Sequence, residues 1–266
     1  MDRIVFAERW REIFAASGFK SFSDFFLYSS GEIINPKGKR NVQTLKLTDN
    51  GLSRVVYIKR FNYPHLKDMI SSFKSFGRCL SQAAIEWENA NFLLKRNIGT
   101  YKPLCFGEKI ICGLERKSFF VSEKLDGLCL SDFVRENWNR MSRQEKEAVM
   151  ADLGKFVRKI HDAQVNFPDM YIWHIFISPG KQRTEHRFSI IDLHRMEFNV
   201  TNRKKQVSNL GRFEYSLLDE YFNDSLRRLF VRSYAADVPG EDAERLYEKI
   251  KKYCRKLLSK RKQKPY

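Results

Sequence analysis

The stretch "VNFPDMYIWHIFI" (Val165–Ile177) sets an aspartate, Asp169, and a histidine, His174, among aromatic and aliphatic residues. A second stretch, "FSIIDLHR" (Phe188–Arg195), contains an apolar run that ends abruptly in Asp192. Ionisable side chains are uncommon inside apolar runs, because a buried charge without a partner is unfavourable. The two stretches therefore raise the hypothesis of one site with two aspartates and a histidine.

The composition is that of a globular protein. The chain has 266 residues, of which 42% are hydrophobic and 14% aromatic, and this excludes a disordered chain. No run of about 18 apolar residues is present to cross a membrane. The start, "MDRIVFAERWREIF", interrupts its apolar residues with charges, unlike a secretory signal. The five cysteines lack CxxC or zinc-type spacing, so we expect reduced packing residues in a cytoplasmic protein.

The charge is strongly positive. Lys and Arg number 49 against 32 Asp and Glu, which gives a net charge of +17. Such a charge favours anionic partners, among them nucleotides, nucleic acid, acidic glycolipids and membrane surfaces, or it serves solubility alone. Charge by itself does not choose among these.

The first half of the chain has the pattern of strands followed by a helix. A hairpin is predicted by β-prone runs on both sides of the Asn-Gly turn in "TDNG". A helix with a serine cap and a further strand follow. The predicted elements are a strand at Gly31–Pro36, the hairpin Val42–Leu47 and Arg54–Phe61, the helix Ser81–Arg96 and the strand Lys117–Leu125.

The second half is predicted to be helical. We place the boundary at the Asp126-Gly127 break, which gives lobes 1–125 and 126–266. From Ser142 a long helix is indicated by apolar residues that recur every three or four positions; these are Val149, Leu153, Phe156, Val157 and Ile160. The fold class predicted is α+β, with a β-rich N-lobe and a helical C-lobe.

This order is that of a bilobal protein-kinase-like fold, and the parts for phosphoryl transfer occur in the required sequence. Lys59 lies on the predicted third strand, where the phosphate-pairing lysine belongs, and Glu86 lies on the next helix, where its partner belongs. Asp169 and His174 keep the spacing of the aspartate and asparagine in H-R-D-x-x-x-x-N, and Asp192 takes the position of the D-F-G aspartate.

Each residue also has a plainer interpretation. Lys59 alone would be a solvated strand residue, and Glu88 is a rival to Glu86 as its partner. Asp169 alone would be a turn residue after a proline, and Asp192 a strand-end cap. The combination favours the kinase interpretation, because a γ-phosphoryl group in transfer needs a carboxylate, metal ions and a cation that no short motif can supply.

These segments resemble the lipopolysaccharide core heptose kinases of Gram-negative bacteria. The family typically carries NHRDCYICHFLL and VIDLHR where this chain has "VNFPDMYIWHIFI" and "IIDLHR", and "EWEN", "KPLCFGE" and "VSEKL" also resemble it. The likeness covers about Gly31 to Phe198. It implies an ATP-dependent transferase that phosphorylates a heptose hydroxyl of the lipopolysaccharide inner core, at the cytoplasmic face of the inner membrane.

The resemblance also implies roles for single residues. Lys59 and Glu86 would hold the nucleotide phosphates, and the backbone at Glu123–Leu125, including Glu123 and Leu125, would meet adenine. Asp169 would be the base or the group that orients the acceptor. His174 and Asp192 would face the metal, expected to be Mg²⁺, although imidazole suits Mn²⁺ better.

Two departures from the expected pattern stand out. Phe167-Pro168 replaces the family's His-Arg before Asp169, which removes a cation and a hydrogen-bonding ring. No G-x-G-x-x-G loop occurs, and "NPKGKRN" (Asn35–Asn41) has a single glycine, Gly38, with three cations that either contact phosphates or form a solvated turn.

The last helix is basic. In "AERLYEKIKKYCRKLLSKRKQK" the apolar residues fall near one face with lysines and arginines around it; these are Leu246, Ile250, Tyr253, Leu257 and Leu258. The pattern is typical of a helix on an anionic membrane or glycan, and equally of a docking helix with a solvated basic face. With no A-P-E motif, the acceptor predicted is the lipopolysaccharide core glycolipid, and no nucleic acid is expected.

Two alternatives remain open. One is a kinase-like phosphotransferase for another small-molecule or protein acceptor. The other is a pseudokinase that serves as a basic scaffold, although such a scaffold has no need of Lys59, Asp169 and Asp192 together.

Overall fold

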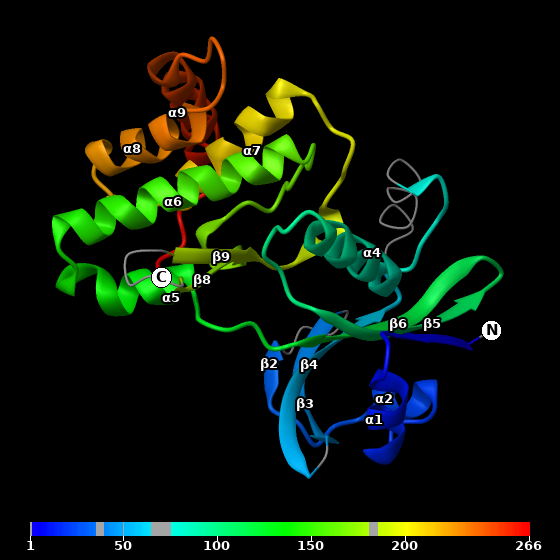
Figure 1. Cartoon of the computed structure of the whole chain (residues 1–266). Coiled ribbons are helices and arrows are strands. Elements are labelled where there is room, and N and C mark those ends of the chain that lie inside the picture. The colour runs from blue at the N-terminus through cyan, green and yellow to red at the C-terminus, as the bar shows by residue number, and fades with distance from the viewer. Residues whose placement is uncertain (1, 36–39, 50, 65–75, 181–185) are drawn as a thin grey trace. The chain divides into compact units, whose positions relative to one another are not determined.

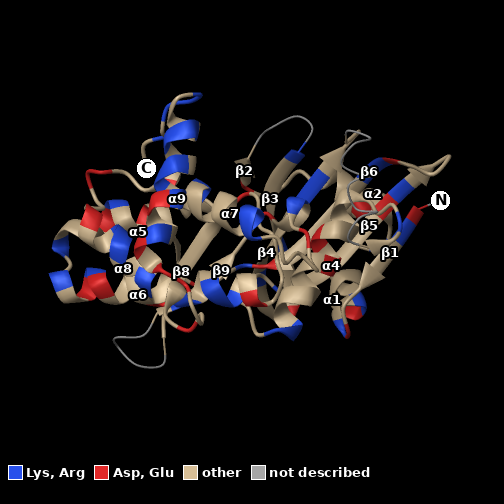
Figure 2. Cartoon of the chain, turned by 90° about the horizontal axis from the view of Figure 1, so that it is seen from above, with Lys and Arg blue, Asp and Glu red and all other residues tan. Residues whose placement is uncertain are grey.

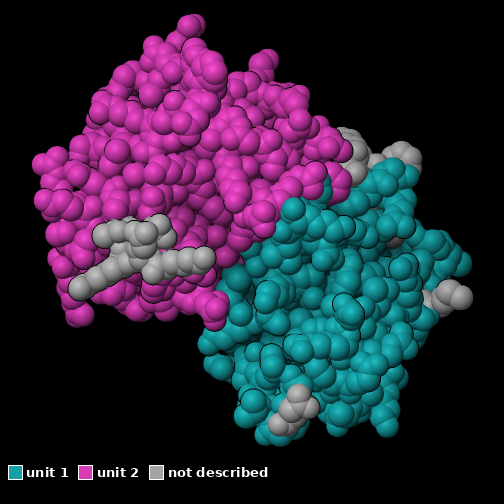
Figure 3. Space-filling view, in the orientation of Figure 1, with its two compact units in different colours: residues 1–95, 100–125 teal, residues 96–99, 126–266 magenta. Residues whose placement is uncertain are grey.

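The computed structural model describes residues 2–35, 40–49, 51–64, 76–180 and 186–266. The chain forms two compact units, one of residues 1–95 and 100–125 and the other of residues 96–99 and 126–266 (Figure 3). Gly38, one of the residues expected at a phosphate, lies outside the described residues. Among the described residues, no helix is both long enough and apolar enough to span a bilayer.

The first unit is built on an antiparallel sheet with the strand order β1-β5-β6-β4-β3-β2 (Figure 1). Its strands are β1 (Asp2–Phe6), β2 (Ile33–Asn35), β3 (Arg40–Asp49), β4 (Leu52–Asn62), β5 (Pro103–Ile111) and β6 (Leu114–Glu123). The predicted hairpin is β3–β4, where Gly51 has a φ of 78° that favours glycine. Sequence analysis missed β1 and β5, which pair with each other along the sheet.

Helices cover both faces of this sheet. The helices α1 (Trp10–Ala16) and α2 (Phe22–Leu27) lie on one face, and α4 (Gln82–Lys95) lies on the other (Figure 1). Successive side chains of β6 point to opposite faces of the sheet. Phe119 therefore stacks on Phe25 of α2, while Phe120 packs against Tyr101. The predicted serine cap of α4 is confirmed, because Ser81 Oγ accepts the N–H of Ala84 at 3.1 Å.

The second unit is mainly helical. Its helices are α5 (Leu130–Asn137), α6 (Arg143–Asp162), α7 (Arg203–Ser216), α8 (Asp224–Ala235) and α9 (Ala243–Leu258). A small sheet of β7 (Leu128–Cys129), β8 (Ile175–Pro179) and β9 (His186–Ile190) joins them, with the short 3₁₀ turns η1 (Trp138–Arg140), η2 (Ile172–His174) and η3 (Leu193–Arg195). The α+β prediction is confirmed.

The long helix α6 begins where its sequence predicts. Ser142 and Glu145 form a reciprocal capping box at its start. The predicted apolar face packs inward, with Phe156 only partly buried. Gly154 lets α8 approach closely, since a Cβ there would lie 2.5 Å from the carbonyl oxygen of Phe230.

The apolar side of α9 differs from the predicted one. Leu246 and Ile250 are buried as expected, together with Tyr247 and Cys254, but Leu258 is 44% exposed. The reason is that α9 packs on α7 and α8 through the face that carries these buried residues, and Leu258 is not part of that face. Figure 2 shows Lys and Arg along the rest of α9. Of the cysteines, only Cys105 and Cys254 are buried, so a packing role for all five is wrong.

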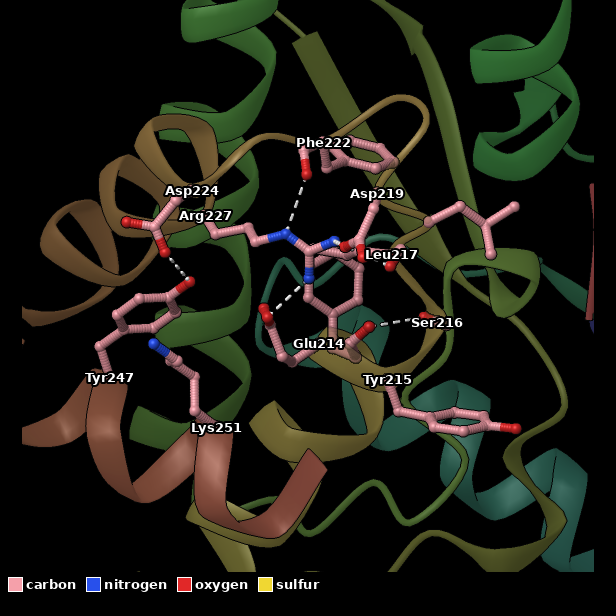
Figure 4. Close-up of polar contacts among 12 residues, drawn as sticks. Glu214, Tyr215, Ser216, Leu217, Asp219, Phe222, Asp224, Arg227, Tyr247 and Lys251 are labelled. Atoms are coloured by element: carbon pink, nitrogen blue, oxygen red, sulfur yellow. Dashed lines mark hydrogen bonds and ion pairs between the residues drawn. The ribbon is translucent and has the colours of Figure 1, made fainter. Parts of the chain in front are cut away.

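A buried arginine joins α7 to α8. Arg227 donates to Glu214 at 2.6 Å and to the carbonyl oxygens of Phe222 and Leu217, each at 3.0 Å (Figure 4). Glu214 is 6% exposed and Arg227 8%. Asp219 accepts a further N–H at 2.7 Å, so the guanidinium closes the loop between the two helices with four hydrogen bonds.

Replacement of Arg227 by methionine is expected to lower the free energy of unfolding by about 3–5 kcal/mol, since it leaves Glu214 buried without its cation. Urea unfolding followed by circular dichroism measures this change. The neighbouring Arg228→Met is the control, because Arg228 pairs with Asp224 at the surface, and its expected loss is below about 1 kcal/mol. Equal losses in the two variants would contradict this view of the pair.

Candidate active site

A buried ion pair in the first unit joins β4 to α4. Lys59 Nζ lies 2.5 Å from Glu86 Oε1, and the glutamate side chain is 1% exposed. The hydroxyl of Tyr101 donates to the other carboxylate oxygen of Glu86. Both oxygens of the carboxylate therefore have donors, which keeps the buried charge stable and fixes the lysine. Sequence analysis missed Tyr101, because nothing in its neighbourhood marks it as a polar partner.

The rival glutamate lies elsewhere. Glu88 is at the surface and its Oε1 is 3.4 Å from Arg78 Nη2. Two positions along a helix correspond to a rotation of about 200°, so Glu86 and Glu88 point to nearly opposite sides of α4. Of these two glutamates, Glu86 is the one that pairs with Lys59.

A buried carboxylate of β6 binds the start of α4 by hydrogen bonds. Glu115 accepts the N–H of Gln82 at 2.9 Å and the hydroxyl of Ser118 at 2.5 Å, and Ser118 also accepts the N–H of Ala83. Burial raises the pKa of Glu115 from its ordinary value to about 7. These contacts hold the helix, and with it Glu86, against the sheet that carries Lys59.

The predicted adenine segment follows directly from β6. Glu123 is the last residue of the strand, and its N–H donates to the carbonyl oxygen of Lys102 at 2.9 Å. Lys124 and Leu125 lie beyond the strand, Lys124 exposed and Leu125 half-buried. The N–H of Glu123 is thus used inside the protein, and hydrogen bonds to a base would come from other main-chain groups of the segment.

In the second unit, Asp169 precedes η2 and is held by a cation. Its side chain is 11% exposed, and Arg195 Nη1 donates to Oδ1 at 3.0 Å. Arg195 comes from the "DLHR" stretch, 26 residues further along the chain. Pro168 stands where the sequence pattern has an arginine next to the aspartate. In this structure Arg195 provides a cation for Asp169 instead.

Two hydrogen bonds and one buried ring fix the segment around Asp169. The side-chain amide of Asn166 donates to Glu197 at 2.8 Å, and the N–H of Ile172 donates to Ser216 Oγ at 2.9 Å. Phe167 is fully buried. Its ring therefore holds the segment by apolar packing, where the family's histidine would hold it by a hydrogen bond. The segment is therefore held at both ends while Asp169 projects between them.

Asp192 has an unusual backbone. Its φ of 62° and ψ of 58° lie in the left-handed region, which aspartate adopts more readily than most residues. His194 Nδ1 lies 2.9 Å from Asp192 Oδ1, and His174 Nε2 lies 3.9 Å from Oδ2. The His174 ring is oriented by a 2.7 Å hydrogen bond between its Nδ1 and the carbonyl oxygen of Asp169.

The arrangement fits a divalent cation. With Nδ1–H of His174 donating to a carbonyl, Nε2 carries the lone pair that can bind a metal. Two ligand bonds of about 2.1 Å can span the 3.9 Å between this nitrogen and the Asp192 oxygen. The donor set of one imidazole and one carboxylate suits Mn²⁺ at least as well as Mg²⁺.

A neutral histidine lies behind this segment. His161 Nδ1 is 2.8 Å from the hydroxyl of Tyr234. With its amide oxygen turned to the main chain, Asn209 accepts the N–H of Phe167 at 3.0 Å and lies 3.3 Å from His161 Nε2. Burial lowers the pKa of His161 to about 3, assisted by the charges of Arg158 and Arg203. The uncharged ring can donate once and accept once, as the two neighbours require.

Comparison with known proteins gives the relatives of the chain. A family model described as "Lipopolysaccharide kinase (Kdo/WaaP) family" matches residues 28–248. A protein of Escherichia coli K12 named lipopolysaccharide core heptose(I) kinase WaaP is 26% identical over 244 residues, 84% of this chain and 90% of that protein. One of the same name from Pseudomonas aeruginosa is 25% identical over 187 residues, 63% of this chain and 70% of that protein.

A solved structure described as WaaP in complex with acyl carrier protein has a TM-score of 0.70 with this chain. It covers 96% of this chain and 99% of its own, at 21% sequence identity. At that identity the likeness shows the fold, and the kinase-like fold predicted from the sequence is confirmed.

Acid is expected to destabilise the second unit through His161. The depressed pKa means that the stabilisation is complete above about pH 6.5 and is lost as the pH falls towards 3. Between pH 7.5 and 5 the loss from this group is about 2 kcal/mol. Urea unfolding at the two pH values should show that His161→Gln loses less stability than wild type.

His186→Gln is the matched control, because His186 is only partly buried and lies 3.2 Å from Asp152. It should leave the acid loss close to that of wild type. An unchanged acid loss in His161→Gln would rule out the neutral buried ring as its source.

Proposed function

This chain belongs to the lipopolysaccharide kinase (Kdo/WaaP) family, and we propose that it transfers the γ-phosphoryl group of ATP to a heptose hydroxyl of the lipopolysaccharide inner core. The relatives that carry the name heptose(I) kinase support this acceptor. The observation that carries the proposal is the clustering of Asp169, His174 and Asp192 around one turn of the second unit, with Asp169 fixed by a cation.

Asp169 orients the acceptor hydroxyl and takes its proton as the phosphorus–oxygen bond forms. Oδ1 is held by Arg195, and this orients the carboxylate towards the acceptor.

Lys59 binds the α- and β-phosphates of the nucleotide. Glu86 and Tyr101 keep its ammonium at one place on β4. A strand and a buried helix support this pair, so the cation needs little reorganisation when charge moves during transfer. The main chain at Glu123–Leu125 contacts adenine.

Asp192 and His174 would hold a divalent cation, which neutralises charge on the β- and γ-phosphate oxygens. The metal is Mg²⁺, with Mn²⁺ as the alternative that the imidazole favours. His194 donates to Asp192 Oδ1 and so turns the other carboxylate oxygen towards His174.

The acceptor is a glycolipid, so the enzyme works at the cytoplasmic face of the inner membrane. The exposed basic side chains of α9 contact the anionic surface peripherally while its apolar side stays packed on α7 and α8 (Figure 2). Each basic residue near such a surface contributes about 1 kcal/mol.

Two variants test the assigned roles in an assay of ATP turnover with core oligosaccharide as acceptor. Asp169→Asn should lower the acceptor-dependent kcat by roughly 10²–10⁴-fold, since the amide cannot take the proton. Lys59→Met should lower kcat/KM for ATP by roughly 10²-fold through loss of the phosphate cation.

The controls change the same groups at exposed positions. Asp162→Asn removes a surface carboxylate at the end of α6, and Lys46→Met removes a surface cation from β3. Both should keep near wild-type rates. If Asp169→Asn turned over ATP and acceptor as well as Asp162→Asn does, Asp169 would not be the base.

A further inference from the structure

The segment after α9, residues 259–266, folds back along the second unit. In Figure 1 it leaves α9 in red and runs towards the β8–β9 hairpin. Gln263 donates to the carbonyl oxygens of Tyr215 at 2.8 Å and Leu217 at 3.2 Å. The hydroxyl of Tyr266 donates to the carbonyl oxygen of Ser216. The segment is therefore attached to the end of α7 rather than extended into solvent.

The attachment places two cations on an aromatic pair. The rings of Tyr171 and Trp173 stack with centroids 4.8 Å apart. Arg261 donates to the Tyr171 hydroxyl at 2.6 Å, and Lys264 Nζ lies 5.8 Å from the centre of the Trp173 ring. Cation–π attraction and the phenol hydrogen bond hold both side chains there.

This aromatic pair lies near Asp169 in the chain and is linked to its backbone by hydrogen bonds. Tyr171 follows Asp169 by two residues, and its N–H donates to the carbonyl oxygen of Asp169 at 2.8 Å. Trp173 precedes His174, which binds the same carbonyl oxygen. Arg261 and Lys264 therefore contact the side chains of two residues that follow Asp169 in the same turn.

The cations of this segment have no acidic counterpart in the part of the chain that the structure describes. Residues 259–266 hold four lysines and arginines without an aspartate or glutamate. Elsewhere in the unit, arginines have carboxylate partners, as in Arg158–Asp162 and Arg203–Glu241. Arg261 and Lys264 remain largely exposed, so their outward N–H groups can bind an external anion.

We infer that Arg261 and Lys264, held on the Tyr171–Trp173 pair, form an anion-binding subsite for the acceptor saccharide beside Asp169. The inference rests on the proposed function, since it assigns these cations to the acceptor of that reaction. The ligand class is a carboxylate or phosphate group carried by the saccharide. Fixed cations suit such a group better than freely moving lysines do, because less side-chain entropy is lost on binding.

The test is steady-state kinetics with deacylated core oligosaccharide as the varied acceptor. The double variant Arg261→Gln, Lys264→Gln should raise the acceptor KM by about tenfold or more, because each charge-assisted contact contributes substantially to binding. The KM for ATP should stay unchanged. Arg261→Lys, which keeps the charge, should recover part of the loss.

The control is Lys155→Gln, Arg187→Gln, which removes two charges from exposed positions of α6 and β9. It should leave the acceptor KM unchanged. An oligosaccharide whose phosphates have been removed and whose carboxylates have been reduced to alcohols should bind wild type and the double variant equally. A fall in kcat with an unchanged acceptor KM would overturn the inference, since the segment would then only position the Asp169 turn.

Saccharide binding can also be measured without turnover, by tryptophan fluorescence during titration with the oligosaccharide. The signal of Trp173 is the fluorescence change of wild type minus that of Trp173→Phe. If wild type transfers no phosphate but binds the saccharide through these cations, the proposed function fails and the subsite stands. If wild type does not bind the saccharide, the subsite is overturned. The same holds if the double variant loses binding to anionic vesicles but still binds the saccharide as wild type does.

Discussion

The ion pair between Asp169 and Arg195 is the constraint on which the second unit's chemistry depends. The side chain of Asp169 is 11% exposed, and Arg195 gives this nearly buried carboxylate a cationic partner. That cation comes from the turn that also carries Asp192, so formation of the pair brings the two stretches "PDMYIWH" and "IDLHR" together. The surrounding hydrogen bonds from Asn166 and Ile172 then fix the backbone from both sides.

The first unit holds its charged side chain in a similar way, but here the charge is positive and its partner is negative. Lys59, the proposed phosphate-binding lysine, is held by a buried glutamate, and Tyr101 supplies a second donor to that glutamate. The sheet and α4 position the pair, and Glu115 attaches the start of α4 to β6. In both units a charge with a proposed role in transfer is paired with an opposite charge, so it needs little reorganisation when charge develops.

Local features of the fold were predictable from the sequence, and long-range ones were not. Ser81 and Ser142 mark helix starts because a cap involves residues only three positions apart. The partners β1 and β5 are about a hundred residues apart, and no local pattern reports their pairing. Arg195 was visible in "DLHR", but its partner Asp169 required the fold. Glu86 and Glu88 look alike in sequence, and only packing separates them.

The central claim is transfer of a phosphate group to a heptose. Mass spectrometry of core oligosaccharide after incubation with ATP and Mg²⁺ or Mn²⁺ tests it most directly, with fragmentation to locate the modified sugar. The account predicts a mass increase of one phosphate group on a heptose with wild type and none with Asp169→Asn. ATP hydrolysis with no phosphate on the saccharide, or phosphate on a sugar other than heptose, would contradict it.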